Sequence, residues 1–283
     1  YVETSVPLAP PAEAAAYLAK NEEIDARRDR LRARVRAIEK AHRDRLELEL
    51  RLLLGVPLHL TRGYASAEVG ENYERAGKLC ADVGDARQLF EIVQSVWYRQ
   101  SVASELDGAL RSADELARIA AQHQVPEFSL RAELARGRTE FWKGNFRKAA
   151  DILTRFLEEI ERHPFEARDG MYGVHPAIPG FALCGRALWF LGRADQARAL
   201  AARGLAYAEE SHHPFSLAAW LVHSAIFEAV CENWETTADL AARAAEISAA
   251  NGFSHFAALS RFFGAAALAE QGDLEHGLPE MLA

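Results

Sequence analysis

Five short segments of similar pattern recur along the chain at nearly constant spacing, and they constrain its fold more than any other feature. The segments are 104–109, 144–149, 192–197, 232–237 and 272–277. Their first residues are separated by 40, 48, 40 and 40 positions, and each segment has an apolar residue two places on and a small residue three places later. Such a repeat is typical of stacked helix hairpins, because one hairpin cannot bury its apolar face alone.

The small residue that closes each segment predicts where the two helices of a hairpin cross. Ala109, Ala149 and Ala197 suit a close crossing, because a larger side chain would force the helices apart. The far ends of the hairpins are marked by Pro126, Pro164, Pro214 and the pair Asn251 and Gly252. The sequence therefore predicts an all-α fold, a right-handed superhelical array of tetratricopeptide-like helix hairpins (an α-solenoid) with a period of about 40 over residues 55–283.

Two further segments and one insertion complete the predicted organisation. Residues 1–12 are proline-rich and are expected to form a leader. Residues 13–54 predict a charged helix with a short heptad seam at Ile24, Leu31, Val35 and Ile38. We expect this helix to end at Gly55, because glycine suits a C-cap and Pro57 interrupts the helical hydrogen bonds. Three Pro and three Gly between residues 164 and 180 predict a loop insertion there.

The distribution of charge and cysteine argues against several classes of partner. The formal net charge is −8, and residues 20–51 hold eleven Lys/Arg against eight Asp/Glu, a net of +3 that leaves −11 elsewhere. An acidic body disfavours nucleic acid as a partner, and no apolar run is long enough to predict a membrane span. Cys80, Cys184 and Cys231 lie far apart, which is typical of free thiols in a reducing compartment. We expect a cytoplasmic protein that binds neither nucleic acid nor membrane.

No catalytic, metal or cofactor motif stands out. The sequence has no HExxH and no GxSxG, and its ten histidines are scattered. The stretch from Gly70 to Lys78 has glycines seven apart and is followed by Leu79, where a phosphate loop needs Ser or Thr. We therefore expect a chain that is not an enzyme and that needs neither metal nor cofactor.

The first helix of each predicted hairpin is the better place to look for a binding site, because such helices line the concave groove of these arrays. Counting back six positions from each segment gives Tyr98, Arg138, Arg186, Ile226 and Ala266. Counting back two gives Val102, Trp142, Phe190, Val230 and Glu270.

Tyr98, Arg138, Trp142, Arg186 and Phe190 are the candidate site residues. Arginines flanked by aromatic rings could hold a carboxylate and an apolar side chain of a peptide. Alternatively, the arginines pair internally with Glu133 or Glu140 and the aromatic rings belong to the core, and the apolar residues in the last two units favour burial there.

Several motifs carry a resemblance to a known family. They are Leu53-Leu-Gly-Val-Pro57, Thr61-Arg-Gly-Tyr-Ala65, Tyr73-Glu-Arg-Ala76, Met171-Tyr-Gly-Val-His-Pro176, Ala187-Leu-Trp-Phe-Leu-Gly192 and His213-Pro-Phe-Ser-Leu-Ala218. From about Leu46 to Ala283 the chain resembles the C-terminal tetratricopeptide region of bacterial signalling ATPases, which carry a class III adenylate/guanylate cyclase domain or a winged-helix regulator domain. The sequence departs from the family pattern at His175, where an acidic residue is usual, and over residues 1–45.

The resemblance implies a regulatory module that binds a protein or peptide, including sister ATPase or cyclase domains of the same polypeptide. The alternative is a sensor that holds a small ligand in the groove beside the 164–180 loop. Because the chain begins at Tyr1 and its last hairpin is short, we expect it to be a piece of a longer protein. Leu274, Leu278, Met281 and Leu282 would then be covered by further repeats or by self-association.

Overall fold

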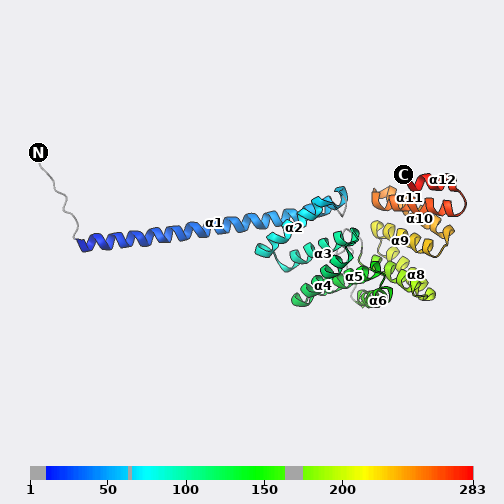
Figure 1. The fold of residues 1–283 in the computed structure, drawn as a ribbon, viewed down its shortest axis with the longest axis horizontal. Helices are drawn as coiled ribbons and strands as arrows, with labels where there is room; N and C mark the ends of the chain where they lie inside the picture. Colours follow the sequence, from blue (N-terminus) through cyan, green and yellow to red (C-terminus); the bar gives the residue numbers. More distant parts are fainter. Residues whose placement is uncertain (1–10, 63–65, 163–174, 283) are drawn as a thin grey trace.

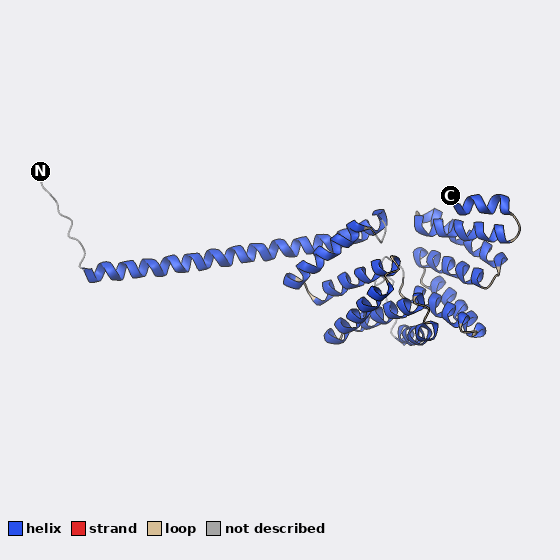
Figure 2. Ribbon diagram, in the orientation of Figure 1, coloured by secondary structure: helices blue, strands red, loops and turns tan. Residues whose placement is uncertain are grey.

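The computed structural model describes residues 11–62, 66–162 and 175–282, and these ranges form helices and no strand (Figure 2). The helices are α1 (Pro11–Arg62), α2 (Ala67–Val83), α3 (Ala86–Val102), α4 (Leu106–His123), α5 (Pro126–Trp142), α6 (Phe146–Arg162), α7 (Ala177–Phe190), α8 (Ala194–Glu210), α9 (Pro214–Val230), α10 (Trp234–Asn251), α11 (Ser254–Glu270) and α12 (Leu274–Leu282). The predicted all-α class is confirmed, and the arrangement is consistent with an α-solenoid.

All five predicted segments begin in a tight turn between two helices. The first residues Ser104, Gly144, Gly192, Glu232 and Gly272 have φ between 58° and 100°. In each turn the next backbone N–H donates to the carbonyl five residues before it, over 2.8–2.9 Å. This left-handed residue and its back-reaching hydrogen bond form the helix C-cap that satisfies the last carbonyls. Pro126 and Pro214 begin α5 and α9, and Gly252 caps α10 with φ 72°.

The small residues at the predicted helix crossings are buried. Ala109, Ala149, Ala197 and Thr237 have no exposed surface. At the fifth crossing a Cβ added to Gly277 would lie 2.7 Å from the backbone oxygen of Ala265, which leaves no room for any side chain. The helices of each hairpin therefore approach closely at the positions that the sequence predicts.

Leucine at Ala149 or Ala197 is expected to lower the free energy of unfolding by about 1–3 kcal/mol, because the added carbons must displace the facing helix. Circular dichroism melts would measure the loss. Ala199→Leu, at an exposed position of α8, is the matched control and should change the midpoint little. Equal melting curves for all three variants would contradict the close crossings.

Helices α2 to α12 follow an arc, with α4, α6 and α8 along its outer side (Figure 1). Contacts between helices agree with this curvature. The first helices of successive hairpins touch, since α3 contacts α5, α5 contacts α7, α7 contacts α9, and α9 contacts α11. The second helices α4, α6, α8 and α10 make at most slight contacts with one another. The first helices therefore lie on the shorter side of the curve, which we call the inner face.

Packing between successive hairpins joins them into continuous cores. Phe90 of α3 stacks on Phe128 of α5, with ring centroids 4.1 Å apart. Trp97 donates a buried hydrogen bond from its indole Nε1 to Thr139 Oγ1 over 2.9 Å, which ties α3 to α5. The largest cluster of buried apolar side chains extends from α5 to α11. Each hairpin thus depends on its neighbours for burial, as expected of a repeat array.

Helix α1 is longer than the sequence suggests. The prediction that it ends at Gly55 is wrong, because the helix continues through Pro57 to Arg62. A Cβ added to Gly55 would lie 2.0 Å from the hydroxyl oxygen of Tyr73 on α2. Glycine is therefore required there by the close approach of α2 and not by a helix cap. The seam residues Ile24, Leu31, Val35 and Ile38 are all exposed.

The predicted loop insertion also differs in part. Residues 163–174 lie outside the described part of the chain, but Ala177 to Gly180 form the first turn of α7 rather than a loop. Pro179 is tolerated there because the first-turn N–H groups have no helical partner. A Cβ added to Gly180 would lie 2.6 Å from Phe156 Cε1, so this glycine lets α7 pack against α6.

The last helix presents apolar side chains to its surroundings. On α12 the side chains of Leu274, Leu278 and Leu282 are exposed, while Gly277 is buried against α11. The expected coverage of these leucines by a further repeat or a second copy stays a prediction.

Candidate functional site

Four apolar side chains form a row across successive first helices. Val102 of α3, Trp142 of α5, Phe190 of α7 and Val230 of α9 are 50%, 53%, 47% and 37% exposed. Each lies two residues before its turn, so the row repeats one position of the hairpin. We call these four residues the apolar stripe. Because Trp142 and Phe190 are about half exposed, they do not belong to the buried core, which was the alternative interpretation.

The candidate arginines lie one turn before Trp142 and Phe190 on the same helix faces. The guanidinium of Arg138 lies over the rings of Trp97 and Tyr98, at 5.0 and 5.5 Å from their centroids. Its Nε is buried and has no hydrogen-bond partner. Among the described residues, no carboxylate lies within ion-pair distance of Arg138, so the aromatic rings supply its main contacts.

Arg186 is more deeply buried, at 6% exposure. Its guanidinium lies 5.4 Å from the ring centroid of Phe141, and its Nε donates a long 3.4 Å hydrogen bond to the carbonyl oxygen of Ala182. Burial, and then the positive charge of Arg138, lowers the pKa of Arg186 to about 10. Each arginine thus reaches back to an aromatic ring of the preceding first helix, and no described carboxylate neutralises it.

The two glutamates that were alternative partners for these arginines are engaged elsewhere or unpaired. Glu140 forms an ion pair with Lys148 at 2.5 Å and accepts a hydrogen bond from Asn145 at 2.7 Å. Within the described residues Glu133 forms no ion pair, and burial raises its pKa. The structure therefore shows no internal pairing of Arg138 or Arg186 with either glutamate.

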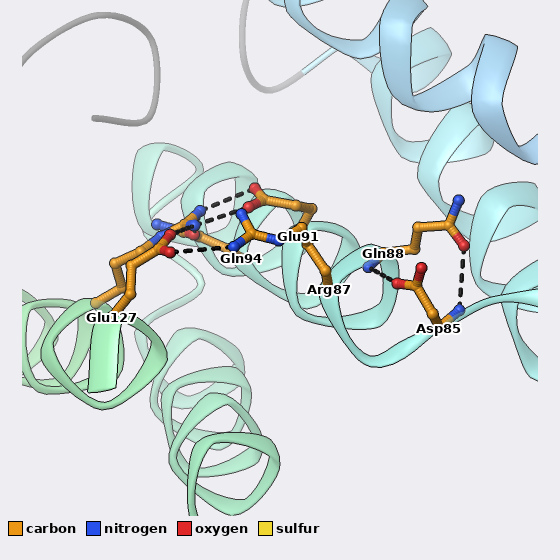
Figure 3. A network of polar contacts seen from close by, with 7 residues as sticks. Asp85, Arg87, Gln88, Glu91, Gln94 and Glu127 are labelled. Atoms are coloured by element: carbon orange, nitrogen blue, oxygen red, sulfur yellow. Dashed lines mark hydrogen bonds and ion pairs between the residues drawn. The ribbon is translucent and has the colours of Figure 1, made fainter. Parts of the chain in front are cut away.

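A third arginine of the inner helices shows what an internally paired guanidinium looks like in this fold. Arg131 of α5 donates to both carboxylate oxygens of Glu91, at 2.7 and 2.8 Å, and to Glu127 at 2.9 Å. Figure 3 shows Glu91, Gln94 and Glu127 close together, with Arg87 beside them. Burial opposes its charge, but the two carboxylates outweigh burial and raise the pKa of Arg131. Arg186 is equally buried, and no carboxylate in the part of the chain that the structure describes forms an ion pair with it.

His223 of α9 adds an imidazole beside the two arginines, and the alignment by turns missed it. Ile226 is the residue of α9 that aligns with Arg138 and Arg186, and His223 lies three residues before it on the same helix face. A search one turn further back from the aligned positions would therefore have identified His223. Its Nδ1 is buried without a hydrogen-bond partner. Burial, followed by the charges of Arg186, Arg138 and His255, lowers the pKa of His223 to about 3. We call Arg138, Arg186 and His223 the cationic cluster.

The lowered pKa of His223 predicts sensitivity to acid. Between pH 6.5 and about 3 the unfolded chain binds a proton at this histidine and the folded chain does not, so the free energy of unfolding falls as pH falls. His223→Gln should therefore lose less stability than the wild type between pH 7 and pH 4 in urea titrations. The exposed His123→Gln is the control and should retain the wild-type loss. Identical losses for His223→Gln and the wild type would contradict the burial of a neutral histidine.

His175, where the sequence departs from the family it resembles, has a structural role. Its Nδ1 accepts a hydrogen bond from the backbone N–H of Ala177 at 3.2 Å, which caps the start of α7. Its ring also contacts the Tyr207 hydroxyl, 3.0 Å from Nε2, and its backbone N–H donates to Ser216 Oγ at 3.2 Å. Because Nδ1 accepts, Nε2 carries the proton and donates to Tyr207. His175 therefore joins α7, α8 and α9.

The described residues contain neither a metal-binding group nor a membrane-spanning helix. In residues 11–62, 66–162 and 175–282, no group of three or more His, Cys, Asp or Glu side chains could hold a metal ion. Nor does any helix in these ranges have the length and apolar character needed to cross a membrane. Cys80, Cys184 and Cys231 are free thiols.

Comparisons with known proteins bear on the fold only. No protein-family model matches the sequence, and no curated protein matches it significantly. Among solved structures, the crystal structure of BtubC (BKLC) from P. vanneervenii is similar over 77% of this chain and 89% of that one, with a TM-score of 0.53 and 16% identity. At this identity the likeness shows a shared helical fold.

Proposed function

We propose that this chain is a protein-interaction and regulatory module, a right-handed tetratricopeptide-like array that binds a partner segment on its inner face. The observation that carries the proposal is the apolar stripe, since Trp142 and Phe190 stay about half exposed in a fold that buries most other aromatic side chains. Exposed aromatic residues beside arginines are typical of binding hot spots. The module has no catalysis of its own in this proposal.

The resemblance of the sequence to the repeat region of bacterial signalling ATPases supports a regulatory role. The partner is then a protein or peptide, including a sister ATPase or cyclase domain of the same polypeptide. The repeat period of about 40 comes from the sequence spacing, and a cytoplasmic location fits the three free cysteines.

One observation favours a second function, the sensing of a small ligand. The cationic cluster contains buried nitrogen atoms without hydrogen-bond partners, and a small anionic ligand would satisfy them. A metabolite that raises the melting temperature of the chain without any peptide would support this alternative.

Selection from a random peptide library would test the interaction proposal. Peptides enriched on the wild-type protein should bind the Trp142→Ala Phe190→Ala variant at least about tenfold more weakly, since removing a hot spot costs about 2 kcal/mol or more. Leu50→Ala, which removes an exposed apolar side chain of α1, is the control and should leave affinity unchanged. Peptides that bind both variants as tightly as the wild type would place binding elsewhere and refute the proposal.

A further inference from the structure

We propose that the cationic cluster binds an anionic oxygen group, a carboxylate or a phosphate, through the guanidinium groups of Arg138 and Arg186 and the imidazole of His223. The three residues come from α5, α7 and α9, which are successive inner helices in contact with one another. The inference deepens the proposed function, because the anion would be the charged group of the bound partner or ligand.

Charge balance is the first argument. A buried cation without a counter-charge is costly, and folded proteins usually pair such groups. Arg131 shows that this fold can supply carboxylates to a buried arginine, through Glu91 and Glu127. Two turns further along the same helix, Arg138 has no such partner among the described residues, and neither has Arg186 on the next inner helix. A ligand that carries negative charge would supply the counter-charge that residues 11–62, 66–162 and 175–282 do not.

Two buried nitrogens of the cluster lack hydrogen-bond partners. Arg138 Nε is a donor, and His223 Nδ1 is a donor when this ring nitrogen carries the proton. An unbonded Nε alone decides nothing, because Arg131 Nε is also without a partner although its terminal nitrogens are paired. In Arg138 the terminal nitrogens also lack a protein partner in the described residues, so the whole fork is available. A guanidinium fork matches the two oxygens of a carboxylate or phosphate.

The aromatic contacts are the third argument, since they hold the arginines in place without using their donors. Arg138 stacks on Trp97 and Tyr98, and Arg186 stacks on Phe141. Stacking occupies the face of the guanidinium and leaves its edge free to donate hydrogen bonds. Side chains that are fixed before binding lose little conformational entropy when the ligand arrives.

Binding of the anion should be coupled to uptake of a proton by His223. The charged and titratable groups that face this histidine are Arg186, Arg138 and His255, all cationic or neutral. A bound anion would offset the two arginines and favour the imidazolium, which gives an additional donor from the ring. The bound anion would raise the pKa of His223 above about 3, its value in the unliganded protein, so affinity for the anion should increase as pH falls through the raised value.

Calorimetric titration of the full chain with inorganic phosphate tests the site directly. Wild-type protein should bind phosphate, and Arg186→Met and Arg138→Met should each weaken binding about 30-fold or more, because each removes a charged donor to the anion. Arg155→Met, on an exposed part of α6, is the control and should bind as the wild type does. Arg138 is partly exposed, so Arg138→Met tests the site at a position where the substitution disturbs packing less than at the buried Arg186.

Two further experiments identify the source of the anion and distinguish the anion site from the interaction proposal. A selected peptide with a free C-terminal carboxylate should compete with phosphate, and its amidated form should not, if the anion is that carboxylate. If phosphate binds and no peptide does, the interaction proposal fails while the anion site stands. Absence of phosphate binding, or binding that neither arginine variant weakens, would overturn the anion site whatever the peptides do.

Discussion

Replacing Phe156 with alanine is expected to lower the free energy of unfolding by about 3–5 kcal/mol, the usual cost of deleting a buried aromatic ring. Phe156 of α6 is fully buried, and its ring lies against Gly180 at the start of α7. The ring therefore packs across the junction between two hairpins and not only within one. Chemical denaturation monitored by circular dichroism would measure the change.

Phe190→Ala is the matched control for this prediction. It removes the same ring from an exposed position of α7, where the remaining contacts are with Phe141 and Phe146. Loss of these contacts should cost about 1 kcal/mol. If Phe156→Ala cost no more than Phe190→Ala, the continuous core between the two hairpins would be wrong.

Methionine should change stability differently at two equally buried arginines. Arg131→Met leaves Glu91 without its cation and Glu127 with Arg87 alone, and it is expected to cost about 2–3 kcal/mol. This is below the full penalty for breaking a buried ion pair, since Glu91 keeps 35% side-chain exposure. Arg186→Met removes a buried charge that no carboxylate of the described residues neutralises, so it should leave stability unchanged or increase it. Melting curves in buffer free of phosphate and carboxylates would measure both.

Arginine 186 would then be retained for binding and not for folding. Binding sites commonly lower the stability of the fold, because they place charged groups where only a bound ligand can neutralise them. A loss of stability at Arg186→Met as large as that at Arg131→Met would show instead that its stacking on Phe141 is a structural contact.

The turns and helix crossings could be predicted because their chemistry is local. A residue in the left-handed conformation ends each first helix, and a small residue five positions later lets the second helix pass closely. Both requirements fix residue types within a segment of six residues. Because this segment recurs five times, the pattern could be recognised from the sequence. The predicted helix end at Gly55 was wrong because the reason for this glycine is not local: Tyr73, eighteen positions away, occupies the space of the absent side chain.

The candidate site could be predicted only in part, for a similar reason. The register of the turns identified Arg138, Trp142, Arg186 and Phe190, because equivalent positions of a repeat share a face. It could not show that Trp142 and Phe190 stay exposed, or that the arginines stack on rings instead of pairing with Glu133 or Glu140. These outcomes depend on which side chains of neighbouring hairpins meet in space. His223 was missed because its position differs by one turn from the aligned one.

The indole resonances of the five tryptophans offer the most direct test of partner binding on the inner face. Trp142 belongs to the apolar stripe, whereas Trp97 and Trp220 are buried in the core. On titration with a selected peptide, the Trp142 indole N–H signal should shift and saturate with the dissociation constant measured by calorimetry, while the signals of Trp97 and Trp220 stay in place. A peptide that saturates the protein without moving the Trp142 signal would contradict the account.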